Sequence, residues 1–218
     1  AGKTTTLLHL LRELKSRGER CAVLVNEFGA LGIDGAVLSD SPALSVMEIP
    51  DGCICCTLAG RLVEALAEIA ERIRPGRLFV EPTGLARPEE IRRIFMHEDT
   101  ANLYALGPVL TVVDPMTFLK LQGRPMPFYE GQVAEADVII ANKLDRAAAG
   151  DLARFREAIA KANPRARVIE TQYGKVPLDV LEEKEGRDAS TPSGESHGHQ
   201  HEHARGESLS LRKPDEIR

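Results

Sequence analysis

Five short apolar runs are spread along the chain, and the last three each end in a polar or acidic residue. They cover residues 21–26, 44–49, 77–82, 108–115 and 137–145. Stretches with apolar residues at helical spacing lie before and between them. Runs without polar alternation are typical of strands buried on both faces, and strands that alternate with helices form parallel sheets. We therefore predict an α/β protein with a mainly parallel sheet and helices on both faces, whose ligands bind at the carboxyl ends of the strands.

Composition narrows the class of protein further. The 218 residues are 43% hydrophobic, which suits one globular domain with a tail or part of a second. A formal net charge of −5 gives no basic footprint for nucleic acid, and no apolar run approaches the roughly 20 residues that cross a bilayer. Four cysteines, three of them clustered, favour a reducing compartment over a disulfide framework. We therefore expect a cytoplasmic protein that binds neither nucleic acid nor membrane.

The first residues, AGKTTT, match the second half of the phosphate-loop pattern Gly-x-x-x-x-Gly-Lys-Ser/Thr. In this pattern Gly2 lets the backbone wrap the phosphates, and Lys3 supplies a cation for the β- and γ-phosphates. The Thr4 hydroxyl can coordinate Mg²⁺, and the helix that begins here directs its amides at the anion, so Thr5 is also counted as nucleotide-binding. Because the first glycine is absent, a chance Gly-Lys-Thr in a loop is the alternative.

Residues 142–145, NKLD, follow an apolar run and match the guanine-recognition motif of GTPases. The carboxylate of Asp145 can accept two hydrogen bonds from guanine, one from the ring N–H and one from the exocyclic amine. Adenine offers no such pair, so ATP would leave that carboxylate unpaired. In this interpretation Lys143 lies against the purine face, and Asn142 ties the loop to other nucleotide-binding segments. A solvated turn is the alternative.

Residues 79–84, FVEPTG, end another apolar run where ordinary GTPases carry Asp-x-x-Gly. Here Glu81 and Gly84 give Glu-x-x-Gly. Glu81 is predicted to hold Mg²⁺ through a water or to orient the attacking water, and the Gly84 amide to sense the γ-phosphate. Together with Lys3 they are the candidate catalytic residues. A buried structural glutamate is the alternative for Glu81.

Three of the four cysteines, Cys53, Cys55 and Cys56, fall within four positions just ahead of a predicted helix. Thiolates are soft ligands that favour Zn²⁺ and Cu⁺ over Mg²⁺ or Ca²⁺, and Gly52 permits the turn that would bring three sulfurs to one ion. Three protein ligands leave a fourth tetrahedral position open, which suits a site that releases its metal. A redox dithiol, a buried structural cluster and a reactive nucleophile are the alternatives. Cys21 lies inside an apolar run and is predicted to be a core residue.

The composition changes at about residue 186, where the chain becomes polar and loses apolar periodicity. Residues 186–207 are therefore predicted to form a disordered linker. Its histidines stand at alternate positions and can collect Zn²⁺, Ni²⁺ or Cu²⁺ as auxiliary ligands. They are His197, His199, His201 and His203. An irrelevant polar linker or an affinity tag is the alternative.

Taken in this order, the motifs resemble those of the CobW-type metallochaperone GTPases of the CobW/HypB/UreG superfamily, relatives of the nickel-inserting GTPases of hydrogenase and urease maturation. The match runs from AGKTTTLL through VNEFGALGIDGAVL, GCICCTLAG, VEPTGLARP and VVDP to ANKLD, roughly residues 1–183. The resemblance implies a P-loop GTPase that binds a transition metal, most often zinc, at Cys-x-Cys-Cys and hands it to a client metalloprotein. Co²⁺, Ni²⁺ and Fe²⁺ stay alternatives to Zn²⁺, because thiolate and imidazole sites accept several metals.

The resemblance also assigns a switch region to residues 26–38. Many relatives have an acidic residue directly after Asn-Glu-Phe-Gly, whereas this chain has Ala30, so Glu27 or Asp34 would supply a carboxylate needed there. We hypothesise that GTP and Mg²⁺ order this segment and the turn at residues 81–84, and that hydrolysis then changes metal affinity or client contact. Because related GTPases often dimerise, a homodimer is also expected.

Both ends of the chain are expected to be cut, since it opens inside a phosphate loop and stops soon after a strand-like alternation begins. The expected divisions are a P-loop GTPase domain without its first strand and the start of its phosphate loop (1–185), the linker (186–207), and the start of a truncated CobW-type C-terminal domain (208–218). Two other functions compete. NKLD argues against a small-molecule kinase or transferase, and the intact nucleotide motifs argue against a non-enzymatic metal buffer.

Overall fold

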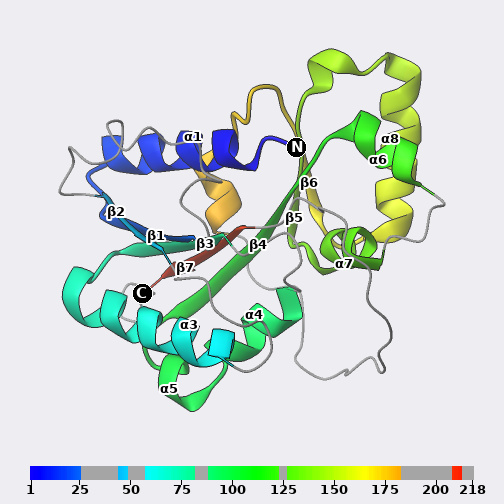
Figure 1. Ribbon diagram of the computed structural model, residues 1–218. Helices are drawn as coiled ribbons and strands as arrows, with labels where there is room; N and C mark the ends of the chain where they lie inside the picture. The colour runs from blue at the N-terminus through cyan, green and yellow to red at the C-terminus, as the bar shows by residue number, and fades with distance from the viewer. Residues whose placement is uncertain (26–43, 49–56, 82–87, 123–126, 183–207, 213–218) are drawn as a thin grey trace.

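The computed structural model describes residues 1–25, 44–48, 57–81, 88–122, 127–182 and 208–212 of the chain (Figure 1). These residues form one sheet covered by helices on both faces. The prediction of an α/β protein with a mainly parallel sheet is confirmed. Part of the predicted site lies outside the described residues: Glu27, Cys53, Cys55, Cys56, Gly84, His197, His199, His201 and His203.

Within the described residues the sheet has seven strands in the order β2-β1-β3-β7-β4-β5-β6. Their bounds are β1 (Cys21–Val25), β2 (Leu44–Glu48), β3 (Arg77–Glu81), β4 (Ala105–Val113), β5 (Val138–Ala141), β6 (Arg167–Glu170) and β7 (Ser208–Arg212). All neighbours pair in parallel except β7, which is antiparallel to both β3 and β4. The five predicted runs form β1 to β5. β1, β3 and β5 are buried along their whole length, as expected where helices cover both faces.

One strand goes beyond the predicted set, and one predicted strand belongs to this sheet and not to another domain. β6 is a short strand at the edge of the sheet, where half-buried and exposed side chains alternate. β7 lies at the centre, between β3 and β4, although the sequence predicts that residues 208–218 begin another domain. Its pairing with β4 shifts register between Leu106 and Val109, around Pro108, whose nitrogen cannot donate a hydrogen bond. The predicted linker and domain boundaries themselves stay predictions.

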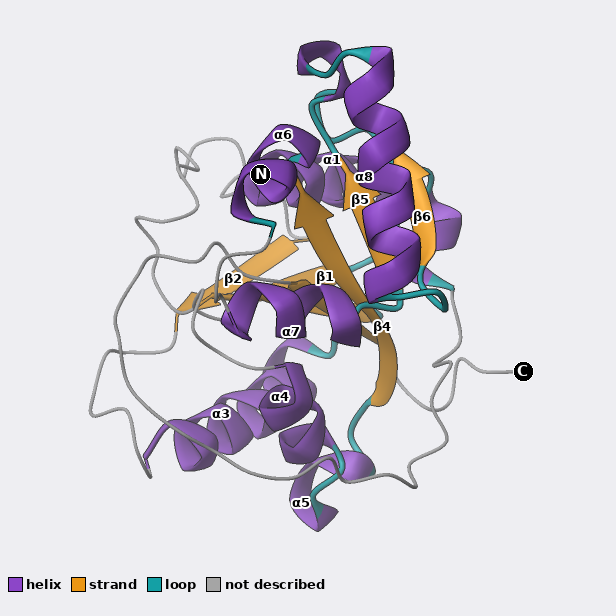
Figure 2. Cartoon of the chain, turned by 90° about the vertical axis from the view of Figure 1, so that its right-hand side faces the viewer, coloured by secondary structure: helices purple, strands orange, loops and turns teal. Residues whose placement is uncertain are grey.

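Helices cover both faces of the sheet. Their bounds are α1 (Lys3–Ser16), α3 (Thr57–Glu68), α4 (Pro88–Phe95), α5 (Glu98–Ala101), α6 (Pro115–Leu121), α7 (Pro127–Glu135) and α8 (Ala149–Ala162). Three short segments add a π-turn, η2 (Ile69–Ile73), and two 3-10 turns, η3 (Leu144–Arg146) and η4 (Leu178–Leu181). α1 lies on one face, and α3, α4 and α5 lie on the other (Figures 1 and 2).

α1 is anchored by the leucine stripe that its sequence predicts. Leu7, Leu10, Leu11 and Leu14 are each at most 3% exposed. They pack against side chains of β1, β3, β4 and β5, together with η4. Because this stripe fixes the whole helix on the sheet, it also fixes the first turn of α1. In both ribbon views the N-terminus of the chain lies at the end of the sheet towards which β4 runs (Figures 1 and 2).

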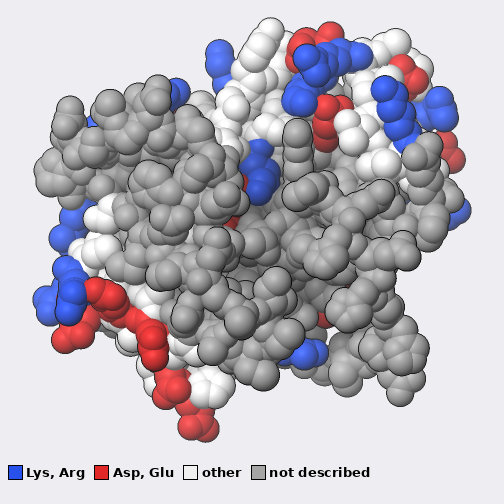
Figure 3. All heavy atoms as spheres, in the orientation of Figure 1, with Lys and Arg blue, Asp and Glu red and all other residues white. Residues whose placement is uncertain are grey.

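The other face of the sheet carries two further apolar clusters. In the first, α3 and η2 place Leu62, Leu66 and Ile69 against β1, β3 and β4. In the second, α7 and α8 pack on β4 and β5, with Phe155 as a fully buried side chain. In the view of Figure 3, basic and acidic side chains lie side by side at the upper right of the described surface, and acidic side chains form a run along its lower left edge. No helix formed by the described residues is both long and apolar enough to cross a bilayer.

Candidate nucleotide-binding site

The start of α1 and the end of β5 are in direct contact. Gly2 is the N-cap of α1 and has a φ of 104°, in the left-handed region that glycine favours. A Cβ at Gly2 would lie 2.4 Å from Nδ2 of Asn142, so no side chain fits there without displacing that amide. The structure thus places the predicted phosphate loop beside the predicted guanine motif.

Asn142 hydrogen bonds to two other segments of the site. Its side chain is buried, and its Nδ2 donates to the carbonyl oxygen of Ala1 at 3.0 Å. Its Oδ1 accepts a hydrogen bond from the backbone N–H of Gly174 at 3.0 Å. One amide therefore joins the first residue of the chain to the loop that follows β6. The sequence predicts that Asn142 ties segments together, and these are the segments it contacts.

The loop at residues 171–175, TQYGK, is a part of the site that the sequence analysis missed. The backbone N–H of Leu144 donates to the Thr171 carbonyl at 3.3 Å, so this loop follows the NKLD loop closely. Gly174 has a φ of 68°, and a Cβ there would lie 2.8 Å from the backbone nitrogen of Thr6 in α1. The available signal was an apolar pair, Val168 and Ile169, followed by polar residues and a glycine. That pattern repeats, in shorter form, the strand ends that were recognised.

Lys3 and Glu81 form an ion pair across the site. Nζ of Lys3, at the first position of α1, lies 2.6 Å from Oε1 of Glu81, at the end of β3. Both side chains are mostly buried, at 19% and 9% exposure. Among the described residues, the other carboxylate oxygen of Glu81 is buried and has no hydrogen-bond partner. A buried, unsatisfied carboxylate oxygen calls for a ligand, because native proteins pair nearly all such groups.

These residues fit the Mg²⁺ that a phosphate-loop protein requires. Mg²⁺ takes oxygen ligands, usually one or two protein groups together with substrate phosphates and waters. The free carboxylate oxygen of Glu81 and the hydroxyl of Thr4, on the first turn of α1, are oxygen donors of that kind. Thr5 follows on the same turn. The donor set present is therefore compatible with the ion.

Lys143 is held in an unusual conformation between β5 and η3. Its φ of 66° and ψ of 38° lie in the left-handed region, which is uncommon for a residue with a side chain. Its ammonium donates to Oδ2 of Asp114 at 3.1 Å. Asp145, the predicted guanine-binding carboxylate, follows in η3 and is exposed.

Asp114 is a charged group at the end of β4. Burial raises the pKa of its carboxyl, but hydrogen bonds from Lys143 and from the backbone of Thr117 and Met116, with the charge of Lys143, outweigh burial and lower that pKa. Nearby, burial and then the charge of Asp114 raise the pKa of Tyr129. The site therefore holds a carboxylate that stays ionised at neutral pH, paired with the lysine of the guanine motif.

The predicted transition-metal ligands, unlike the Mg²⁺ donors Thr4 and Glu81, lie outside the described residues. Within the described part of the chain, no group of three His, Cys, Asp or Glu side chains could hold a metal ion. The described cysteine, Cys21, is 3% exposed in β1, and burial raises the pKa of its thiol to about 12. It is therefore the core residue that the sequence predicts.

A lysine-bearing loop at the N-terminus of a helix, placed on the carboxyl edge of a parallel sheet beside an Asn-Lys-x-Asp loop, defines a P-loop nucleotide-binding protein. Comparison with known families makes this assignment narrower. Residues 1–170 match the CobW/HypB/UreG nucleotide-binding domain, and the chain belongs to that family. This match also favours the metallochaperone interpretation over a small-molecule kinase or a metal buffer.

Several characterised proteins are similar to this chain. It is 37% identical to the zinc chaperone YeiR of Escherichia coli over 205 residues, which are 92% of this chain and 61% of that protein. It is 36% identical to the zinc chaperone CobW of Pseudomonas aeruginosa over 212 residues, which cover 83% of this chain and 56% of that protein. It is 31% identical to the zinc-regulated GTPase metalloprotein activator 1 of Schizosaccharomyces pombe over 190 residues, which cover 84% of this chain and 45% of that protein. The chain thus spans between about half and three fifths of these relatives.

A solved structure supports the fold. The Zn(II)-bound YjiA GTPase of Escherichia coli superposes with a TM-score of 0.62 at 27% identity, over 89% of this chain and 63% of that one. A Zn(II)-bound triple mutant of the same protein gives a TM-score of 0.61 at 26% identity. The predicted P-loop fold is therefore confirmed.

Proposed function

We propose that this chain is the nucleotide-binding part of a GTP-hydrolysing chaperone that carries zinc to a client metalloprotein. One observation carries the nucleotide half of the proposal: the Asn142 side chain joins the start of the phosphate loop to the loop after β6. Two motifs that are 141 positions apart in the chain thereby meet at one edge of the sheet. That meeting is what a guanine nucleotide site requires.

We assign to the nucleotide residues the roles that their motifs predict. Lys3 neutralises the β- and γ-phosphates, and the amides of the first turn of α1, including that of Thr5, face the same anion. Thr4 and Glu81 would hold Mg²⁺, which would supply charge neutralisation for phosphoryl transfer. Glu81 also orients the attacking water, and the Gly84 amide senses the γ-phosphate. Gly2 permits the close approach of the backbone.

Guanine specificity comes from Asp145, whose carboxylate accepts hydrogen bonds from the ring N–H and the exocyclic amine. Its exposure to solvent in η3 leaves both oxygens available to a base. Asn142 holds the loop in place, and Lys143 covers the purine face. Binding of ATP is disfavoured because it would desolvate the carboxylate without giving it these donors.

The metal half of the proposal combines the cysteine motif with the family. Cys53, Cys55 and Cys56 are three soft ligands suited to Zn²⁺, with Co²⁺, Ni²⁺ and Fe²⁺ as competing cargo. Relatives of this chain are named zinc chaperones and a zinc-regulated GTPase metalloprotein activator. Glu27 lies in the switch segment and is proposed as an additional ligand. The alternating histidines His197, His199, His201 and His203 are proposed to collect metal for transfer.

Nucleotide state and metal affinity are proposed to be coupled. Residues 26–38 and 81–84 lie next in sequence to β1 and β3, which are neighbours in the sheet. A change at the γ-phosphate would therefore reach both segments, and through them the cysteine motif after β2. We further propose that the chaperone works in the cytoplasm, where thiolates stay reduced, and as a homodimer.

The proposal is tested by measuring Zn²⁺ affinity with a competing chelator, in the GTP-analogue and GDP states of the full-length protein. Wild type is compared with a Cys53/Cys55/Cys56→Ser triple variant and with Cys21→Ala, which removes a thiol outside the motif. We expect tight binding that needs the three cysteines, survives loss of Cys21, and changes with the nucleotide. Affinity that ignores the nucleotide, or survives loss of the motif, would contradict the proposed coupling or the proposed metal site.

A further inference from the structure

The carboxylate of Asp114 has two separate sets of partners. Its Oδ1 accepts hydrogen bonds from the backbone N–H groups of Met116 and Thr117, at 3.1 and 3.3 Å, and so caps α6. Its Oδ2 accepts a hydrogen bond from the ammonium of Lys143 at 3.1 Å. The Asp114 side chain is 11% exposed and that of Lys143 is 30% exposed, so the pair is partly shielded from water.

The position of Asp114 follows from strand register. β4 and β5 pair in parallel with Val113 opposite Ala141, so Asp114 and Asn142 are the next residues on neighbouring strands. The backbone N–H of Asn142 donates to the Val113 carbonyl at 2.8 Å, which continues the pairing to that point. The end of β4 is therefore fixed directly beside the guanine motif.

Lys143 is consequently held at both ends of its side chain. Its backbone is fixed in the left-handed region between the buried Asn142 and Leu144, whose N–H is bonded to the Thr171 carbonyl. Its ammonium is fixed by Asp114. A lysine stem has several rotatable bonds, and a stem that is already ordered loses less conformational freedom when a ligand packs against it.

We infer that Asp114 is a positioning residue of the nucleotide site, which holds the ammonium of Lys143 so that the aliphatic stem of this lysine forms one wall for the purine base. This inference rests on the proposed GTP site. The lowered pKa of Asp114 is consistent with a carboxylate that stays charged towards Lys143 over the physiological range. Asp114 acts through Lys143 and does not itself touch the base.

The competing explanation is that Asp114 serves only as a helix cap. Asparagine and aspartate are about equally good at this position, because both offer an oxygen to the first N–H groups of the helix. Asp114→Asn therefore keeps the cap and replaces the ion pair with a neutral amide. Asp114→Ala removes both. Lys143→Met keeps the cap and an apolar stem but removes the charge.

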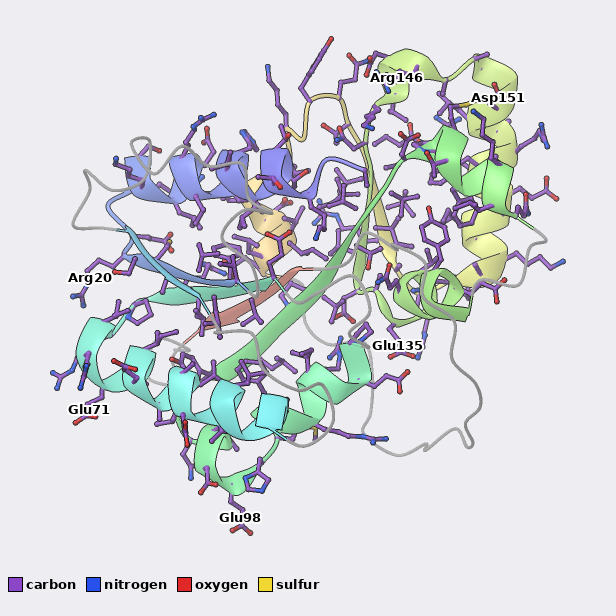
Figure 4. The ribbon with its side chains drawn as sticks, viewed as in Figure 1. Arg20, Glu71, Glu98, Glu135, Arg146 and Asp151 are labelled. Carbon is purple, nitrogen blue, oxygen red and sulfur yellow. The ribbon has the colours of Figure 1, made fainter. Side chains whose placement is uncertain are left out.

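The experiment measures binding of GTP, inosine triphosphate and inorganic tripolyphosphate, each with Mg²⁺, to the full-length protein. Asp114→Asn is expected to lower the affinity for GTP and the affinity for inosine triphosphate by the same factor, about tenfold, because both purine bases would pack against the stem of Lys143. Tripolyphosphate has no base, and its affinity should not change. Asp151→Asn is the matched control. Asp151, labelled in Figure 4, is also an acidic residue at the start of a helix, α8. It forms its ion pair with Arg154.

A double-mutant cycle separates positioning from capping. If Asp114 acts through Lys143, Asp114→Asn causes no further loss of GTP affinity in the Lys143→Met background. Independent losses that multiply, unchanged GTP binding in Asp114→Asn, or an equal loss of tripolyphosphate would each overturn the inference. If Asp114→Asn fails to fold, Lys143→Met tests the ion pair through its other partner. A GTP affinity equal to that of wild type in Lys143→Met would then overturn the inference. Wild type that binds GTP no more tightly than ATP would instead contradict the proposed function.

Discussion

Gly2 and Asn142 are packed so closely that the side-chain amide of Asn142 occupies the space a Cβ on Gly2 would need. Such a Cβ would lie only 2.4 Å from Nδ2 of Asn142. The amide cannot swing aside freely, because it is bonded to Ala1 on one side and to Gly174 on the other. Phosphate loop and guanine loop are therefore positioned by one contact.

Gly2→Ala is accordingly expected to weaken GTP binding by at least about tenfold, or ~1.4 kcal/mol, because it strains the left-handed backbone and displaces the Asn142 amide. The control is Gly18→Ala: Gly18 also has a positive φ, of 76°, but no atom of the described residues lies within 4 Å of its Cβ position. That variant should lose about 1 kcal/mol of unfolding free energy and keep its GTP affinity. Titration with a fluorescent GTP analogue and urea denaturation give both quantities. Equal GTP affinities for the two variants would refute the steric argument.

Substitutions of Lys3 and Glu81 should affect different quantities, the first mainly GTP affinity and the second mainly the rate of hydrolysis. Lys3→Met removes the phosphate-facing cation and leaves a buried carboxylate unpaired, so GTP affinity should fall by at least about 100-fold, or ~2.7 kcal/mol. Glu81→Gln keeps the shape of the side chain and leaves Lys3 for the phosphates, so GTP affinity should fall less than in Lys3→Met, while the single-turnover hydrolysis rate falls about 100-fold. Filter binding and phosphate release measure the two effects. Hydrolysis at the wild-type rate in Glu81→Gln would remove Glu81 from the catalytic residues.

Asp145→Asn is expected to invert base preference. The substituted amide can donate to the 2-oxo group of xanthine but no longer accepts two hydrogen bonds from guanine. The affinity of the variant for GTP should therefore fall by about 100-fold relative to its affinity for xanthosine triphosphate. Glu157→Gln, an isosteric change on α8, is a control for the loss of one acidic charge. A variant that loses affinity for both nucleotides equally would indicate a structural role for Asp145.

The stability of the fold should depend on the ionisation of Asp114. Its pKa in the folded protein lies below the ordinary value of 3.8. The charged form therefore stabilises the fold fully at pH values well above 3.8, and the contribution is lost as the pH falls through the lowered folded-state pKa. The difference in unfolding free energy between wild type and Asp114→Asn should be constant from pH 7 to about 5 and should shrink below that. Denaturation curves over pH 7 to about 2.5 test this, and a constant difference throughout would contradict it.

The cysteines should differ sharply in reactivity. Cys21 is buried and its thiol pKa is raised to about 12, so it stays protonated at pH 8. Iodoacetamide should therefore modify Cys53, Cys55 and Cys56 in the native protein, should be blocked there by Zn²⁺, and should reach Cys21 only after denaturation. Mass spectrometry of peptides from native, zinc-loaded and denatured samples provides the measurement. Native modification of Cys21 at the rate of the other three would show that β1 opens readily.

The strands and the first helix were predictable because their signals are local. The runs that became β1 to β5 are continuously apolar, and the leucines of α1 recur at helical spacing. β6 was harder to recognise, because Arg167–Glu170 is short and its side chains alternate at the edge of the sheet. β7 was recognised as a strand but not as a member of this sheet, since periodicity does not identify a pairing partner.

The sequence predicts which residues belong to the site, but it does not predict which of their side chains contact one another. The sequence pattern identifies Lys3 and Glu81 as nucleotide residues, but the 2.6 Å pair between them depends on how α1 sits on β3. The pairing of Asp114 with Lys143 likewise depends on the neighbouring positions of β4 and β5. Such contacts join residues far apart in the chain, and no local pattern encodes them.

The bonds of Asn142 also bear on how the protein folds. They connect Ala1 with residues 142 and 174, so the chain must close a loop of about 140 residues before the nucleotide site exists. The contacts of the site therefore carry a larger loop-closure cost than the contacts within each helix. A nucleotide that binds only the closed arrangement stabilises the folded chain by mass action. If the chain binds GTP as proposed, guanine nucleotide in the cell would therefore raise the free energy of unfolding of this domain.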